Sequence, residues 1–155
     1  AMRVLVSHGF GQALVDGGGD VLVGAPPPGR SGWRVALDGA GAGGGDPVLL
    51  ELAWSACATS GDRYQRVEID GVIYSHVVDP QTGLGVTHGQ AATVVAPTGA
   101  LADAWASALC VLPAGEGLGL VEERTWLEAR VIGGFGQDDP CESSGLSGMM
   151  VSPGR

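Results

Sequence analysis

Basic residues are scarce in this sequence. Lysine and arginine together number 8 against 17 aspartates and glutamates, which gives a formal net charge of -9. The few cations are scattered along the chain rather than clustered. Nucleic-acid binding depends on clustered cations that neutralise phosphate charges. We therefore expect no nucleic-acid partner.

Long apolar runs and paired cysteines are also missing. No run reaches the roughly 18 apolar residues that a transmembrane helix requires, and no basic and apolar leader opens the chain. We therefore expect a soluble chain without a targeting signal. Cys57, Cys110 and Cys141 form no CxxC pair, which argues against a metal framework and allows at most one disulfide. Cys57 and Cys110 lie among apolar residues and are expected to be small buried side chains.

Glycine and apolar side chains are present in quantity. The 155 residues are 45% apolar, enough for one domain with a real core. The 28 glycines fall in clusters between apolar runs, which is typical of loops and turns. From residue 133 onward the composition shifts to Gly, Ser and Asp. We expect residues 1–132 to form the domain and 133–155 to be a partly disordered tail.

Short strands outnumber helices in the predicted secondary structure. Apolar or alternating runs predict strands near residues 12–16, 21–24, 33–37, 48–54, 92–96 and 126–132. Residues 66–75 predict a β-hairpin, because Asp70-Gly71 is a preferred type I′ turn dipeptide. The pattern indicates an α+β fold with a mainly antiparallel sheet and a few helices.

One helix is predicted over residues 99–112, with Thr98 as its N-cap. Apolar residues at helical spacing predict that one face is buried, and this face comprises Leu101, Trp105, Ala108, Leu109 and Leu112. Asp103 and Ser107 are four residues apart and therefore share another face. Their oxygens could hold one small cation between them. The alternative is an exposed polar stripe on an amphipathic helix.

Two loops carry further polar chemistry. In the loop SHVVDPQTG, His76 is the candidate for proton handling, because histidine side chains commonly act as general acids and bases. Alternatively, His76 only holds the loop through hydrogen bonds to Asp79 or Thr82. In ACATSGD, Thr59 and Ser60 offer hydroxyls to a phosphate or an adenosine, or they simply end a strand in a polar turn.

Four blocks of this sequence resemble one family in the same order. They are ALVDGGGDVLVG, ACATSGDRYQ, YSHVVDPQTG and APTGALADAWAS, and they cover about residues 10 to 125. The match is to the ApbE family, the FAD:protein FMN transferases, and it implies an ApbE-like fold. The blocks correspond to the C-terminal half of family members. A DxxxxxKG segment that precedes this half in the family, and contributes to the flavin and metal sites, is absent here.

The resemblance implies a function and a site. It implies Mg²⁺-dependent transfer of FMN from FAD to a Thr or Ser hydroxyl of a flavin-acceptor protein, with release of AMP. Asp103 and Ser107 would hold Mg²⁺, although the family usually has Thr at the second position. His76 would be catalytic, and Thr59, Ser60 and Val77 would contact the flavin nucleotide.

Other interpretations of the same resemblance remain open. Water could replace the protein hydroxyl, which would make the chain an FAD pyrophosphatase that yields FMN and AMP. The chain could also be a flavin-nucleotide-binding fragment without turnover. A homodimer is an open alternative for its assembly. Family members often work in the cell envelope as lipoproteins, so the resemblance suggests that compartment.

Overall fold

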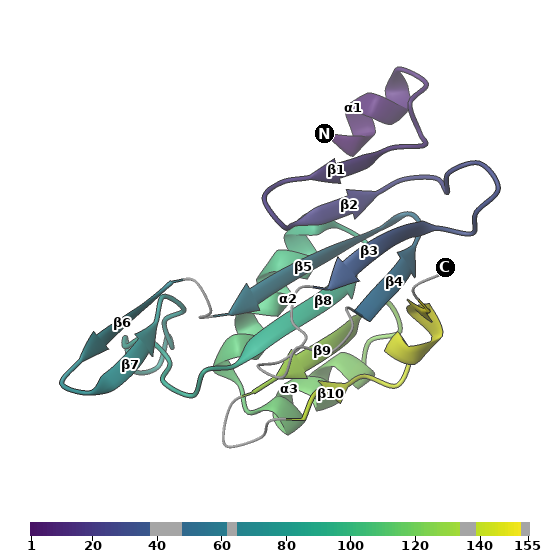
Figure 1. Cartoon of the computed structure of the whole chain (residues 1–155). Helices are drawn as coiled ribbons and strands as arrows, with labels where there is room; N and C mark the ends of the chain where they lie inside the picture. Colours follow the sequence, from purple (N-terminus) through teal and green to yellow (C-terminus); the bar gives the residue numbers. More distant parts are fainter. Residues whose placement is uncertain (38–47, 62–64, 134–138, 153–155) are drawn as a thin grey trace.

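The computed structural model describes residues 1–37, 48–61, 65–133 and 139–152 (Figure 1). The helical segments are α1 Met2–Ser7, α2 Gly99–Val111, α3 Ala114–Glu122 and the short 3₁₀ helix η1 Leu146–Met149. The strands are β1 Leu14–Asp16, β2 Val21–Val23, β3 Trp33–Leu37, β4 Val48–Leu52, β5 Ser55–Gly61, β6 Arg66–Ile69, β7 Val72–Ser75, β8 Ala91–Ala96, β9 Glu128–Ile132, β10 Cys141–Glu142 and β11 Met150–Val151. No helix in the described part of the chain is long and apolar enough to cross a membrane.

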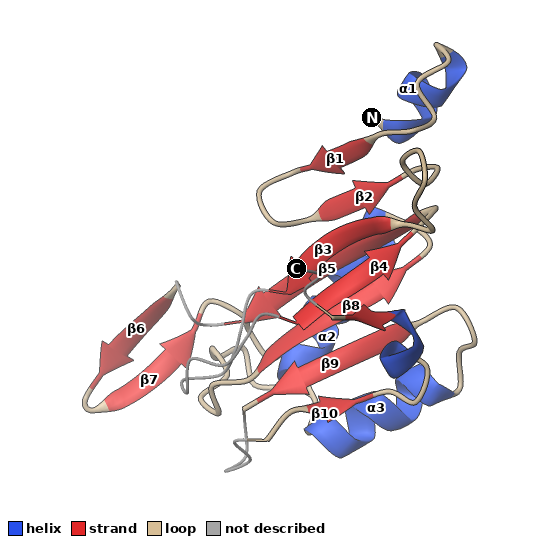
Figure 2. Ribbon diagram, turned by 45° about the vertical axis from the view of Figure 1, so that its right-hand side comes forward, coloured by secondary structure: helices blue, strands red, loops and turns tan. Residues whose placement is uncertain are grey.

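Antiparallel pairing organises the whole structure. The main sheet has six strands in the order β1-β2-β5-β8-β9-β10, and a smaller sheet has the order β11-β4-β3. Helices α2 and α3 cover one face of the main sheet, and the smaller sheet packs on the other (Figure 2). The predicted α+β fold with a mainly antiparallel sheet is confirmed.

Helix α2 lies where the sequence predicts it, but its buried face is different. Thr98 is the N-cap, and its Oγ1 accepts a hydrogen bond from the Leu101 backbone N–H at 3.3 Å. The buried residues are Ala102, Ala106, Leu109 and Cys110. The predicted face was wrong at Leu101 and Ala108, which are exposed, and at Trp105 and Leu112, which are only half-buried.

Small side chains explain this rotation of α2. The sheet presents Ala56, Ala58, Ala92 and Ala96 to the helix, so the helix turns its own alanines inward and approaches closely. A face built from Leu101 and Trp105 would hold the backbones farther apart and leave voids between them. The small alanines of β5 and β8 therefore decide which face of α2 is buried, although its larger apolar residues would be expected in the core.

The C-terminal end of α2 is capped by the loop that leads into β8. His88 donates from Nε2 to the Cys110 carbonyl at 2.8 Å. Gln90, which is buried, donates from Nε2 to the carbonyls of Leu109 and Leu112. The last carbonyls of a helix have no partner within the helix. These two side chains satisfy them and fix the helix to the sheet.

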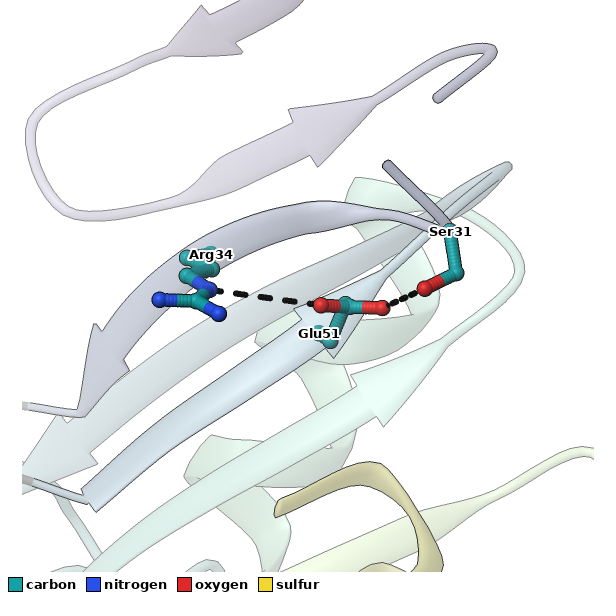
Figure 3. Close-up of polar contacts among 3 residues, drawn as sticks. All are labelled: Ser31, Arg34 and Glu51. Atoms are coloured by element: carbon teal, nitrogen blue, oxygen red, sulfur yellow. Dashed lines mark hydrogen bonds and ion pairs between the residues drawn. The ribbon is translucent and has the colours of Figure 1, made fainter. Parts of the chain in front are cut away.

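A polar contact joins the strands of the smaller sheet at its surface. Glu51 on β4 accepts a hydrogen bond from Ser31 and lies 4.0 Å from Nε of Arg34 on β3 (Figure 3). Exposed ion pairs of this kind contribute little to stability. The sheet is held mainly by its apolar side, where Leu50 and Leu52 are buried.

The segment after residue 133 contains ordered structure. Strand β10 pairs with β9, and β11 pairs with β4, so residues 139–152 contact both sheets. Ser144 donates to the Glu122 carboxylate from its backbone N–H at 2.6 Å and from its hydroxyl at 2.8 Å, which lowers the pKa of Glu122. The rest of the predicted tail, 134–138 and 153–155, lies outside the described residues.

The hairpin of β6 and β7 extends away from the body of the molecule (Figure 1). Asp70 and Gly71 connect its strands with φ values of 50° and 78°. Positive φ at both central residues defines the predicted type I′ turn, whose twist matches that of the strands. The hairpin prediction is confirmed.

Leu146 tests whether the last segment belongs to the domain. Its side chain is 1% exposed and packs in the core between the two sheets. Leu146→Ala should lower the free energy of unfolding by about 2–5 kcal/mol, because a buried leucine leaves a cavity. Urea denaturation would measure the loss. The control is Leu84→Ala, since Leu84 is 60% exposed. Equal effects of the two substitutions would mean that residues 139–152 do not stabilise the domain.

Candidate functional site

Strand β5 and helix α2 meet at two serine hydroxyls. Ser60 Oγ lies 3.0 Å from Ser107 Oγ, within hydrogen-bond distance. Side chains alternate along a strand, so Ser60 shares its face with Ala56 and Ala58, which pack against α2. Two residues that sequence analysis selected separately are therefore brought together.

Thr59 belongs to the other face of the sheet. Its Oγ1 lies 2.8 Å from Oγ1 of Thr93 on β8, on the side that carries the smaller sheet. Adjacent residues of a strand point to opposite faces. Thr59 and Ser60 were assigned to the same nucleotide, but the structure brings only Ser60 beside Ser107.

Asp103 lies on the exposed part of α2, one turn before Ser107. A second carboxylate, Asp20, approaches the same region from the residue before β2. Val21 pairs with Cys57 and Leu22 pairs with Ala56. Extending this register by one residue puts Asp20 beside Ala58, on the sheet face that α2 covers. Partial burial raises the pKa of Asp20, and the negative charges of Asp103 and Asp16 raise it further.

Asp20 is not among the site residues that the sequence predicts. It closes the run Gly17-Gly18-Gly19-Asp20 within one of the blocks that resemble the ApbE family, which was the available signal. Its neighbour Asp103 is more than eighty positions away along the chain. Their proximity depends on β2 pairing with β5 and on α2 packing over β5, and neither contact is visible in local sequence.

The three glycines form a tight turn between β1 and β2. Asp16 Oδ1 accepts hydrogen bonds from the backbone N–H groups of Gly18 and Gly19, at 3.0 and 2.8 Å. Gly18 and Gly19 have φ values of 92° and 106°, which side chains rarely tolerate. The three glycines therefore make a tight connection between the strands, and this connection positions Asp20.

His76 follows β7 directly and is exposed. Its backbone N–H donates to the Gln65 carbonyl at 3.1 Å, and its Nδ1 lies 3.2 Å from the same oxygen. A carbonyl can only accept, so Nδ1 carries the proton and Nε2 keeps its lone pair in the neutral ring. Among the described residues, His76 is thus held by Gln65 and not by Asp79 or Thr82.

The loop after His76 is held by Asp79. Its Oδ1 accepts from the Gln81 backbone N–H at 2.8 Å, and its Oδ2 accepts from the Thr82 hydroxyl at 3.2 Å. The Gly83 backbone N–H donates to the Asp79 carbonyl at 2.8 Å. Aspartate followed by proline commonly starts such a turn. The polar residues of this loop therefore define its shape.

Val77 connects this loop to the core. Its side chain is half-buried and packs against the apolar cluster under α2. Its carbonyl accepts from the Val86 backbone N–H at 2.9 Å, and Val86 in turn accepts from Ser75 at 2.8 Å. Val77 was selected as a flavin contact. In the structure it anchors the loop beside β7.

The predicted burial of two cysteines is confirmed. Cys57 is 3% exposed and Cys110 is 1% exposed. Burial raises the pKa of the Cys57 thiol to about 12, and the charge of Asp20 adds to the shift. A thiol that stays protonated is a poor nucleophile. Cys57 is therefore a core residue and not a candidate nucleophile.

The donor atoms at the junction of β5 and α2 are hard oxygens. Asp103 contributes a carboxylate and Ser107 a hydroxyl, with Ser60 and Asp20 nearby. Within the described ranges, no group of three His, Cys, Asp or Glu side chains could hold a metal by itself. Mg²⁺ is commonly held by one or two protein carboxylates, with phosphate oxygens and water completing the shell. This donor chemistry fits a cation that arrives with a phosphate.

Comparisons with known proteins point to one family. A protein-family model with the description "ApbE family" matches residues 1–131 of this sequence. The FAD:protein FMN transferase of Klebsiella pneumoniae is 33% identical over 112 residues, which are 71% of this chain and 32% of that protein. The enzyme of the same name from Chlamydia trachomatis is 38% identical over 100 residues, 61% of this chain and 29% of that protein.

Solved structures agree with these relatives. The apo form of the Pseudomonas stutzeri flavinyl transferase ApbE matches with a TM-score of 0.75 and 28% identity, covering 99% of this chain and 49% of that one. A mutant of the Vibrio cholerae flavin transferase ApbE matches with a TM-score of 0.78 and 26% identity, covering 95% and 47%. The chain thus spans about a third of the length of the curated relatives and about half of the solved chains.

The raised pKa of Asp20 predicts a pH-dependent effect of Asp20→Asn. The folded state disfavours the Asp20 carboxylate, because its pKa is raised in the folded protein. The wild-type protein therefore loses stability as the pH rises above 3.8, the ordinary pKa of an aspartate. Asp20→Asn should therefore be more stable than wild type at neutral pH, and the difference should disappear in acid. Thermal unfolding from pH 3 to pH 8 would measure it.

The control for this series is Asp139→Asn, which removes an exposed carboxylate elsewhere in the chain. A stability difference for Asp20→Asn that does not change with pH would contradict the raised pKa of Asp20. So would a neutral-pH stability at or below that of wild type.

Proposed function

The chain belongs to the ApbE family, and from this we propose that it takes part in transferring FMN from FAD to a Thr or Ser hydroxyl of a target protein, releasing AMP. Relatives that share its sequence and fold carry the name FAD:protein FMN transferase. The observation that carries the proposal is the junction of β5 and α2. There the Ser60 and Ser107 hydroxyls meet beside the Asp103 carboxylate.

Asp103 and Ser107 would hold Mg²⁺ at this junction. Both side chains offer hard oxygens from one helix face, which suits this cation. Bound Mg²⁺ would neutralise the charge that develops on the phosphates of FAD. Ser107 replaces the threonine that is usual in the family and retains the hydroxyl.

Ser60 would orient Ser107. Once the lone pairs of Ser107 Oγ face a cation, its proton is best donated to Ser60 Oγ at the observed 3.0 Å. Hydrogen bonds from surrounding residues commonly fix the direction of a metal ligand and tune its affinity. This gives Ser60 a positioning role, while the adjacent Thr59 remains on the opposite face.

His76 would accept the proton of the attacking hydroxyl. The hydroxyl oxygen of the target forms a bond to the phosphorus of the FMN phosphate, and the bond from that phosphorus to the bridging oxygen breaks. AMP leaves with this oxygen, and the hydroxyl proton passes to Nε2 of His76. The contact of Nδ1 with Gln65 keeps the lone pair on Nε2, as a general base requires.

Substitution of Asp103 tests the proposed magnesium site. With FAD, Mg²⁺ and a flavin-acceptor domain, Asp103→Ala should lower the rate of AMP release and of FMN attachment at least about a hundredfold, because charge stabilisation at the phosphates is lost. Mass spectrometry of the acceptor and chromatography of AMP would follow the two products. Glu116→Ala, which removes an exposed carboxylate from α3, is the matched control.

Two substitutions of Ser107 test whether its hydroxyl is needed at the proposed magnesium site. Ser107→Thr keeps the hydroxyl and should retain activity, whereas Ser107→Ala should lose about tenfold to a hundredfold. Unchanged rates in both Asp103→Ala and Ser107→Ala would exclude this helix face as the metal site. Release of AMP without a labelled acceptor would instead identify an FAD pyrophosphatase.

His76→Gln should lower the rate of FMN transfer about a hundredfold or more and remove the acidic limb of the pH–rate profile, because no group then accepts the proton. His8→Gln is the matched control, since Nδ1 of His8 also contacts a backbone carbonyl, that of Val4, at 2.9 Å. If His76→Gln keeps the wild-type pH profile while losing stability, His76 only anchors the loop to Gln65.

A further inference from the structure

One face of the projecting hairpin is apolar although it lies in solvent. The pairings of Val67 with Tyr74 and of Ile69 with Val72 put these four side chains on the same side. Val67 is 54% exposed, Ile69 53% and Val72 42%. We call these four residues, Val67, Ile69, Val72 and Tyr74, the hairpin face.

The opposite side of the hairpin is different. It carries Arg66 and Glu68, with Ser75 opposite Arg66 and Ile73 opposite Glu68. Contacts between apolar side chains across the two strands stabilise the hairpin itself, but they leave Val67 and Ile69 more than half exposed. Exposed apolar patches with a polar rim mark interaction surfaces. The segregation therefore indicates that a partner covers the hairpin face.

The hairpin face has a fixed geometric relation to His76. Strand β7 ends at Ser75, which is 6% exposed and donates from its backbone to Val86 at 2.8 Å. His76 is the next residue and is bound to Gln65, just before β6. A molecule bound on the hairpin face is thus held close to the residue that the proposed function uses as a base.

The loop beyond His76 also exposes apolar side chains. Val78 and Leu84 are 52% and 60% exposed, and the bridge between Val78 and Gly85 brings the two sides of the loop together. Exposed aliphatic residues thus flank His76 along the chain on both sides. The polar residues of the loop, Asp79 and Thr82, are already hydrogen-bonded to each other.

The small area of this apolar surface favours a transient partner over a permanent one. Four hairpin side chains and two loop side chains cannot supply the roughly 800 Å² per partner that a stable complex buries. A permanent dimer through this face is therefore disfavoured. A small interface suits a partner that binds, reacts once and leaves.

We propose that the hairpin face is the docking surface for the flavin-acceptor protein, and that it binds aliphatic residues next to the target Thr or Ser. This inference rests on the proposed function, because only that reaction requires a second protein to bring a hydroxyl to His76. Docking on the hairpin would align the acceptor without contacting FAD. Specificity for the acceptor would then be separable from binding of the nucleotide.

The test is the double substitution Val67→Thr with Ile69→Thr. Threonine keeps the β-branched shape and strand preference of these residues while removing apolar surface. The KM for the acceptor domain should rise about tenfold or more, with kcat at saturating acceptor unchanged, since loss of a few central contacts dominates binding at small interfaces. FAD binding, followed by flavin fluorescence, should not change.

Ile73→Thr is the matched control, because it removes the same kind of surface from the opposite side of the same hairpin. Its KM should equal that of wild type. An equal rise in KM for Ile73→Thr, or no rise for the double variant, would overturn the proposal. So would a wild-type dimer in sedimentation experiments that the double variant dissociates, because the face would then join two copies.

Binding of the acceptor domain to wild type and variants, measured by calorimetry without FAD, separates the two proposals. A weaker acceptor complex in the double variant alone supports the docking surface even if no FMN is transferred. An acceptor complex of equal strength in both proteins overturns it even if transfer is observed.

Discussion

The close contact between α2 and the main sheet is the constraint on which the site depends. Ala102 and Ala106 of the helix face alanines of β5 and β8, so the two backbones approach more closely than large side chains would allow. This approach brings the Ser107 hydroxyl to 3.0 Å from Ser60 and leaves Asp103 at the open side of the helix. A larger residue in the contact would move the helix and separate these oxygens before it disturbed any of them directly.

The same contact gathers negative charge that the fold by itself does not balance. Asp20 follows the glycine turn before β2, and its pKa is raised first by partial burial and then by the negative charge of Asp103. Binding sites often keep such unfavourable arrangements because the ligand relieves them. A cation held with the phosphates of FAD is the relief that the proposed function supplies.

His76 is positioned by a different set of interactions. The hairpin that turns at Asp70-Gly71 precedes it, and the loop held by the hydrogen bonds of Asp79 follows it. Val77 ties the loop to the core under α2, and Gln65 fixes the ring. The histidine is therefore placed by short-range geometry, while the oxygens of α2 and β5 are placed by packing. The exposed hairpin face leaves the first of these units accessible to a protein partner.

Local interactions were readable from the sequence, and contacts across the chain were not. The turn dipeptide, the Thr98 cap and the limits of α2 depend on residues a few positions apart, so the sequence alone determined them, as it did the family resemblance. Tertiary structure decided which face of α2 is buried and that Thr59 and Ser60 point to opposite sides. It also decided that Asp20 joins Asp103, and that residues 139–152 add strands to both sheets. The physical reason is that these outcomes depend on the size and position of partners far away in the chain, which no local pattern encodes.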